Sequence, residues 1–79
     1  MGQEAWKANS EKAEKLFLRA LELNRLNANA RRGLGMLYER LDRKQEAASE
    51  YAKYLELAPG AIDNERIRRR ISGLRGDHE

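Results

Sequence analysis

The sequence predicts an all-α fold of short antiparallel helices, and three observations lead to that prediction. The 79 residues include a single proline and few β-branched residues, and alanine, leucine, glutamate, lysine and arginine dominate, a composition that favours helix. Apolar residues recur at spacings of three and four, which marks one face of a helix. Segment 11–24 also matches segment 45–58, and internal repeats with a period of about 34 residues are found in stacked helical arrays.

The first helix is expected from about Ser10 to Asn24. Ser10 or Asn9 can cap its N-terminus by accepting a backbone N–H. One face of this helix is apolar, through Ala13, Leu16, Phe17, Ala20 and Leu21. Residues 1–9 are then expected to be a truncated or flexible N-terminal segment, with Trp6 as its one large apolar residue.

The second and third helices are expected at about 29–41 and 45–57. Three asparagines between residues 24 and 30 favour turn and cap conformations before the second helix. Asp42 tolerates the left-handed backbone that a tight helix exit needs. Pro59 cannot continue a helix and so ends the third one.

The fourth helix is expected within residues 62–75. Asp63 is a suitable N-cap, and Ile62 and Ile67 are spaced for a hydrophobic staple around it. The remaining positions are mostly polar beside a narrow apolar stripe of Ile67, Ile71 and Leu74. Such a helix covers a core with one edge and faces water elsewhere, and residues 76–79 are expected to form a flexible tail.

The internal repeat resembles a known family. Aligning segment 11–24 with segment 45–58 pairs Ala13 with Ala47, Phe17 with Tyr51, and Leu21 with Leu55, and this offset is the period of the tetratricopeptide repeat. Residues 28–61 resemble one complete tetratricopeptide repeat, and the residues that carry the resemblance are Leu34, Gly35, Tyr38, Ala47, Tyr51 and Pro59. Residues 10–27 resemble the second half of a preceding repeat, and residues 62–75 a capping helix.

The resemblance implies one helical domain over residues 10–75, built from about one and a half repeats and the capping helix. It also accounts for a glycine inside a helix, because the family uses a small residue at Gly35 to let the next helix approach closely. Gly33 has no role in the pattern. Tyr54 replaces a small residue of the family and predicts a wider helix spacing or an exposed neighbour.

The resemblance further implies a function, the binding of peptides or partner proteins on a concave surface lined by the first helix of each repeat. The residues that share this face of the helix are Asn29, Arg32, Met36, Glu39 and Arg40. A polarisable methionine between arginines suits an extended peptide that carries carboxylates. The competing interpretation is an ordinary solvated helix face.

Self-association is a second hypothesis. The opening helix of the first repeat is nearly absent, so the N-terminal end is expected to expose apolar surface, which partners tend to cover. The predicted contact residues are Trp6, Leu16, Phe17 and Leu21. The chain is then expected either to be a fragment of a longer array or to form homodimers through this end.

A nucleic-acid accessory role is a third hypothesis. Segment 66–75 holds five arginines and no acidic residue, which suits nucleic acid, anionic lipid or an acidic protein. No aromatic residue lies between the arginines to stack on bases. The pattern therefore favours a solubilising end helix over a nucleic-acid interface.

Catalysis, cofactors and metals find no support in the sequence. The chain has no cysteine and one histidine, His78, which lies in the terminal tail without a second cluster of ligands. No glycine-rich phosphate loop, small-molecule pocket, signal peptide or membrane-spanning run is indicated. We expect a non-enzymatic protein without a membrane partner, and a cytoplasmic location is favoured although the compartment stays open.

Overall fold

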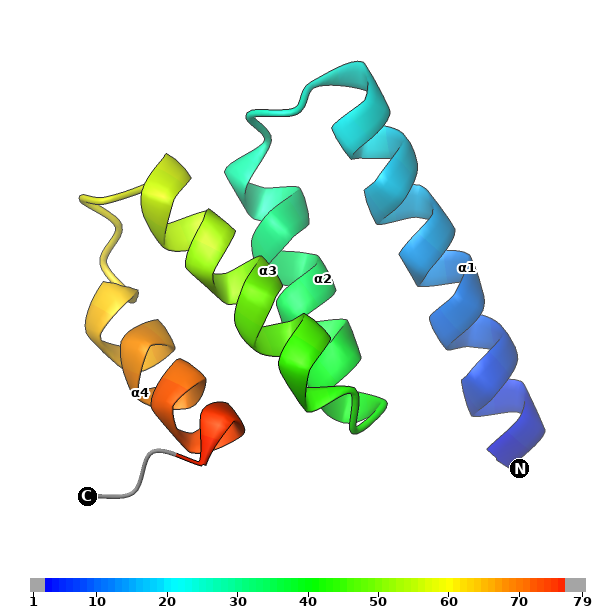
Figure 1. Ribbon diagram of the computed structural model, residues 1–79. Helices are drawn as coiled ribbons and strands as arrows, with labels where there is room; N and C mark the ends of the chain where they lie inside the picture. The colour runs from blue at the N-terminus through cyan, green and yellow to red at the C-terminus, as the bar shows by residue number, and fades with distance from the viewer. Residues whose placement is uncertain (1–2, 77–79) are drawn as a thin grey trace.

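The structure is a computed structural model that describes the backbone of residues 3–76 and the side chains of residues 8–76. Within this range it contains helices and no strand, which confirms the all-α prediction. The helices are α1 (Gln3–Leu23), α2 (Ala28–Arg40), α3 (Lys44–Leu57) and α4 (Asn64–Arg75). Each helix packs on the next one in the sequence, and successive helices run in opposite directions (Figure 1).

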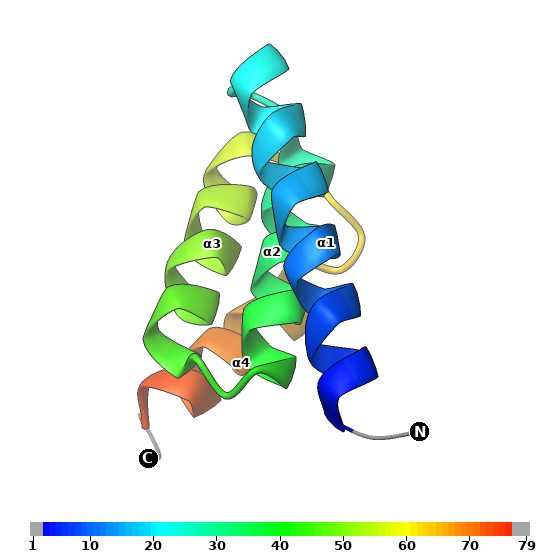
Figure 2. The same ribbon diagram turned by 90° about the vertical axis from the view of Figure 1, so that its right-hand side faces the viewer.

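The prediction for the start of the first helix was wrong. Helix α1 begins at Gln3 and continues without a break to Leu23 (Figure 2). Ser10 is therefore not an N-cap: it lies in the middle part of α1 and is shielded from solvent. Residues 3–9 contain no glycine or proline and include alanine, glutamate and lysine, so nothing in their propensities stops the helix at residue 10.

The turns on either side of α2 follow the sequence prediction. The Asn27 side chain accepts a hydrogen bond of 3.0 Å from the Ala30 N–H and so caps α2. Asp42 adopts the left-handed conformation with φ of 62°. This conformation reverses the direction of the chain after α2, and α3 begins at Lys44. Short connections of this kind hold α2 and α3 as an antiparallel pair.

The core consists of two clusters, and Leu74 of α4 packs against both. The first joins α1, α2 and α3 and contains Leu21, Ala30, Leu34, Tyr38 and Ala47. The second joins α3 to α4 and contains Tyr51, Tyr54 and Ile67. The buried positions of Leu34, Gly35 and Tyr38 agree with the repeat pattern.

The two glycines of α2 each receive an aromatic ring from a neighbouring helix. A Cβ atom on Gly35 would lie 2.5 Å from the Tyr51 ring of α3, which confirms the predicted close approach. A Cβ atom on Gly33 would lie 2.5 Å from the Phe17 ring of α1. Phe17 and Tyr51 occupy equivalent positions of the internal repeat, so α2 accepts equivalent rings from both sides at the cost of helix propensity.

The start of α4 differs in part from its prediction. Asp63 occupies the N-cap position, but its side chain makes no capping hydrogen bond. Ile62 is fully exposed, so the predicted hydrophobic staple between Ile62 and Ile67 does not form. The helix ends at Arg75, and Gly76 caps it with a positive φ of 77°, the left-handed exit that glycine permits.

Candidate functional site

All three tyrosines of the chain donate a hydrogen bond to a carboxylate that an arginine also approaches. Buried tyrosines need a partner for the hydroxyl group, and here each partner belongs to another helix or turn. The three tyrosine clusters are Tyr38–Glu14–Arg43, Tyr51–Glu39–Arg70 and Tyr54–Asp63–Arg32. Together they link all four helices and fix the orientation of α2.

The Asp63 cluster fastens the start of α4 to α2 and α3. Asp63 accepts hydrogen bonds of 2.6 Å from the Tyr54 hydroxyl and 2.6 Å from the Arg32 Nε. Because both donors favour the ionised form, Tyr54 first and Arg32 second, the pKa of Asp63 is lowered. Tyr54 itself is buried, and its hydroxyl reaches Asp63 at the start of α4.

The Glu39 cluster makes a second connection between the same helices. Glu39 accepts 2.8 Å hydrogen bonds from the Tyr51 hydroxyl and from the Arg70 guanidinium. Arg32 and Glu39 of the predicted binding face are therefore both held in ion pairs with the α4 region. Their role in the structure is to position α4, and a substitution at either one would disturb the fold as well as the surface.

The Glu14 cluster joins α1 to the α2–α3 turn. The Tyr38 hydroxyl donates a 2.7 Å hydrogen bond to Glu14, and the Arg43 guanidinium lies 4.3 Å from the centre of the Tyr38 ring. Arg43 also forms a bidentate pair with Glu46, at 2.6 and 2.7 Å. This stacking and pairing holds the turn against α1.

Two of these clusters predict a loss of stability at alkaline pH. Burial, followed by the hydrogen bond to a glutamate, raises the pKa of both Tyr38 and Tyr51 to about 12. A raised pKa in the folded state means that the neutral tyrosines stabilise the fold fully below their unfolded pKa of 10. That contribution is expected to be lost as the pH rises from about 10 to about 12.

Urea unfolding measured across this interval tests the prediction. The free energy of unfolding should fall more steeply for the wild type than for a Tyr38→Phe, Tyr51→Phe variant. Lysine titration is common to both proteins and cancels in the comparison. Parallel curves would show that the two hydroxyls do not contribute in this way.

The exposed part of the predicted binding face is the side of α2 that carries Asn29, Met36 and Arg40. Met36 is 38% exposed, and Arg32 donates a 3.4 Å hydrogen bond to its sulfur. A depression of about 340 Å³ is lined by Met36, Glu39, Arg40 and Arg70. The structure thus brings three of the five predicted residues together and adds a cation from α4.

Arg70 was missed as part of this face, although the sequence contains a signal for it. It lies one repeat period after Met36, so the repeat register places the two at equivalent positions of neighbouring helices. The same register places Arg66 after Arg32. The prediction took the fourth helix as a capping helix and did not extend the binding face onto it.

The predicted self-association residues have different environments. Leu16 is 71% exposed, whereas Leu21 is only 8% exposed and belongs to the core, so its prediction as an exposed contact was wrong. Phe17 is half-buried and packs on the first core cluster. The side chain of Trp6 lies outside the part of the structure that is described.

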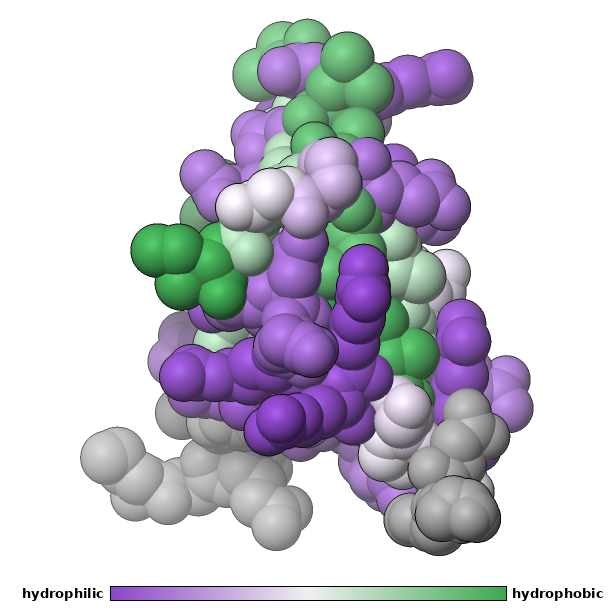
Figure 3. Space-filling model, turned by 90° about the vertical axis from the view of Figure 1, so that its left-hand side faces the viewer, coloured by the Kyte–Doolittle hydropathy of each residue, from purple (hydrophilic) through white to green (hydrophobic). Residues whose placement is uncertain are grey.

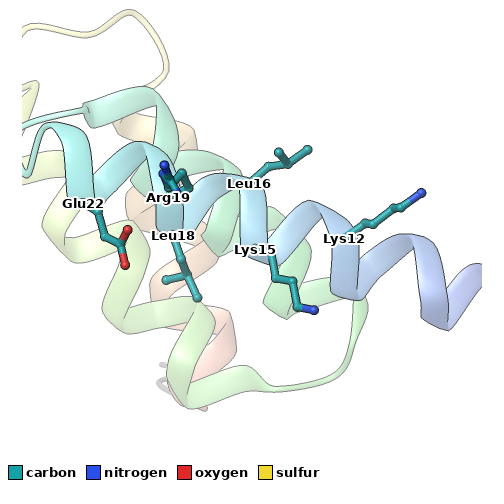
Figure 4. A pocket seen from close by; sticks show the side chains of 6 residues that line it. All are labelled: Lys12, Lys15, Leu16, Leu18, Arg19 and Glu22. Atoms are coloured by element: carbon teal, nitrogen blue, oxygen red, sulfur yellow. The ribbon is translucent and has the colours of Figure 1, made fainter.

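The outer side of α1 carries further exposed apolar and basic residues. A shallow surface there is lined by Lys12, Lys15, Leu16, Leu18, Arg19 and Glu22, all from α1. Figure 4 shows Leu16 and Lys12 projecting from one side of the helix and Leu18 from the opposite side. This surface is therefore the outside of one helix rather than a cleft between elements.

The arginines of α4 are mostly directed toward solvent. Arg66, Arg68 and Arg69 are exposed, and Arg70 is held by Glu39. The face of the molecule on the α4 side is largely hydrophilic (Figure 3). No helix within residues 3–76 is long and apolar enough to span a membrane, and no group of three metal-binding side chains occurs in that part of the chain.

Comparison with known proteins agrees with the helical-repeat architecture. A profile described as tetratricopeptide repeat matches residues 1–62, which include α1, α2 and α3. The chain therefore belongs to the tetratricopeptide repeat family. Searches of curated proteins and of solved structures gave no significant match. Repeats of this family are a non-enzymatic fold that generally mediates protein–protein interaction.

Proposed function

We propose that this chain is an adaptor or scaffold segment that binds a partner protein or peptide on the exposed face of α2. The observation that carries the proposal is the position of Met36 and Arg40, which remain accessible while the neighbouring Arg32 and Glu39 are fixed by ion pairs. A surface whose surroundings are already ordered loses little conformational entropy on binding.

The charges on this face favour a partner segment with carboxylates. Arg40 and Arg70 lie on the same depression as Met36, and guanidinium groups pair well with carboxylates. Glu39 balances Arg70, which leaves Arg40 as the cation most available to a ligand. Met36 supplies an adaptable apolar contact next to it.

The proposal predicts that a Met36→Glu, Arg40→Glu variant loses its protein partner. The exposed positions of both residues should leave the fold intact, whereas Arg32→Glu would break the ion pair with Asp63. Affinity capture from a lysate of the source organism, with nuclease added, checks the prediction. Binding of a discrete protein is expected to fall by about tenfold or more, as it does at interface hot spots.

A control variant separates this effect from general charge repulsion. Arg68→Glu combined with Ser72→Glu makes the same change in net charge on exposed positions of α4. These positions lie outside the Met36 depression, so this variant should capture the partner as the wild type does. Equal capture by all three proteins would contradict the proposal and move the site elsewhere.

Self-association through the N-terminal end is the second candidate function. Its supporting observation is the exposure of Leu16 on α1, since large apolar side chains in solvent favour a covered state. A dimer whose mass persists on dilution to micromolar concentration, and which Leu16→Glu dissociates, would support it. A chain that stays monomeric at millimolar concentration would exclude it.

A further inference from the structure

A groove runs between α1 and α2 on the α1 side of the proposed binding face. It has a volume of about 280 Å³ and is lined by Ala13, Phe17, Gly33, Met36, Leu37 and Arg40. Most of this lining is apolar, and no acidic residue contributes to it. Met36 and Arg40 border both this groove and the Met36 depression, so the two surfaces are continuous.

The internal repeat indicates which kind of segment would fit the groove, because Tyr51 and Phe17 can be compared. Tyr51, the equivalent of Phe17, is 0% exposed because α2 lays Gly35 against its ring and α4 contributes Ile67 to the same cluster. Gly33 is the repeat equivalent of Ile67, so Gly33 gives Phe17 the contact that Ile67 gives Tyr51. No described residue gives Phe17 the contact that Gly35 gives Tyr51, and Phe17 is only half-buried.

Among the described residues, the contact that Phe17 lacks is therefore that of a helix lying antiparallel on α1, as α2 lies on α3. Leu16 is the repeat equivalent of Glu50, and Glu50 pairs with Arg31 of α2 at 2.9 Å. In an equivalent helix on α1, the residue at the position of Arg31 would face Leu16, so an apolar residue would suit that position. A small residue would be needed against the Phe17 ring, as Gly35 is needed against Tyr51.

The charges around the groove indicate which charges the partner helix would carry on its flanks. Lys12 and Arg19 are exposed one turn from Leu16 along α1, and Arg40 borders the groove on α2. A second copy of this chain would bring the same basic residues against this rim, which opposes association. Acidic residues on the flanks of a partner helix would complement them.

We propose that the groove between α1 and α2 binds an acidic amphipathic α-helix of a partner protein, which completes the helical hairpin begun by α1. The inference rests on the proposed function, because it names the kind of segment that the α2 face receives. The helix presents a small residue to Phe17, apolar residues to Leu16 and Leu37, and carboxylates to Lys12, Arg19 and Arg40.

A synthetic helix tests this directly. The probe has the sequence of residues 27–41, which already carries the pattern that covers Tyr51, with two kinds of change. Leucine replaces Arg31, whose position faces Leu16 in this arrangement, and glutamate replaces Arg32 and Arg40. A lactam bridge on its outward face holds it helical, and circular dichroism verifies that. Fluorescence anisotropy of the labelled probe should show saturable binding that Leu16→Glu in the protein weakens by about tenfold or more.

Leu18→Glu is the matched control, because Leu18 is an exposed leucine of the same helix on the opposite side (Figure 4). It should bind the probe like the wild type. A second probe that has the same leucine at position 31 but keeps Arg32 and Arg40 should bind about tenfold more weakly than the acidic one, because its charges repel the rim. Absent saturable binding, equal effects of the two leucine variants, or equal affinity of the two probes would each overturn the proposal.

Further outcomes distinguish a failure of this inference from a failure of the proposed function on which it rests. A dimer that Leu16→Glu dissociates would assign the groove to a second copy and overturn the partner helix. Capture of a protein that depends on Met36 and Arg40 but not on Leu16 would overturn the groove while the proposed function stands. Capture that depends on none of the three would overturn both.

Discussion

Gly35→Ala is expected to destabilise the fold by about 2 kcal/mol, although alanine is the better helix former. The new methyl group would lie 2.5 Å from the Tyr51 ring, which is fully buried and tied to Glu39 through its hydroxyl. Overpacking of such a site costs up to about 3 kcal/mol, and helix propensity returns about 1 kcal/mol. Urea unfolding of the variant and the wild type measures the net effect.

Two other glycines of helices serve as controls. A Cβ atom on Gly73 meets nothing within 4 Å, so Gly73→Ala should stabilise by about 0.5–1 kcal/mol. Gly33→Ala should fall between the two, because the half-buried Phe17 ring contacts it through its outer atoms and can move aside. A Gly35→Ala protein as stable as the Gly73→Ala protein would refute the close-approach explanation.

Asp63→Ala is expected to cost about 3 kcal/mol and to loosen α4. The substitution removes hydrogen bonds from the Tyr54 hydroxyl and the Arg32 guanidinium at once. A bond to a charged group contributes about 1.5–3 kcal/mol, and the stranded hydroxyl adds a desolvation cost. Urea unfolding gives the total, and hydrogen exchange of the α4 amides reports whether that helix opens first.

The pH dependence provides an independent check on Asp63. Its pKa is lowered in the folded state from 3.8, so its contribution is present above that value and lost as the pH falls below it. The stability difference between the wild type and Asp63→Ala should therefore shrink in acid. Glu65→Ala, which removes an exposed acid from the first turn of α4, should cost well under about 1 kcal/mol at neutral pH.

Much of the fold could be predicted because local signals and the repeat agree. The asparagine turn and Asp42 place the ends of α2 and the start of α3 within about one residue of where the structure has them, and the apolar stripe of α2 marks its buried face. The start of α1 could not be predicted in this way, because Ser10 resembles an N-cap but the residues before it also favour helix. A cap signal inside a run of helix formers carries little information.

The site was predicted less completely than the fold, for a physical reason. Helical spacing shows which residues share a face of α2, but it does not show which of them meet partners from other helices. Arg32 and Glu39 are held by Asp63 and Arg70, contacts that depend on where α4 lies. The role of Gly33 likewise depends on the position of the Phe17 ring, which the sequence alone does not give.

The most direct test of the proposed binding face is photo-crosslinking from Met36. The chain contains two methionines, Met1 and Met36, so incorporation of photo-methionine labels the face with almost no change in shape. The labelled chain, irradiated in a lysate of the source organism, should form an adduct with one discrete protein, and a Met36→Leu chain labelled in the same way should not. An adduct that persists in Met36→Leu, or no adduct from either chain, would contradict the assignment of this face.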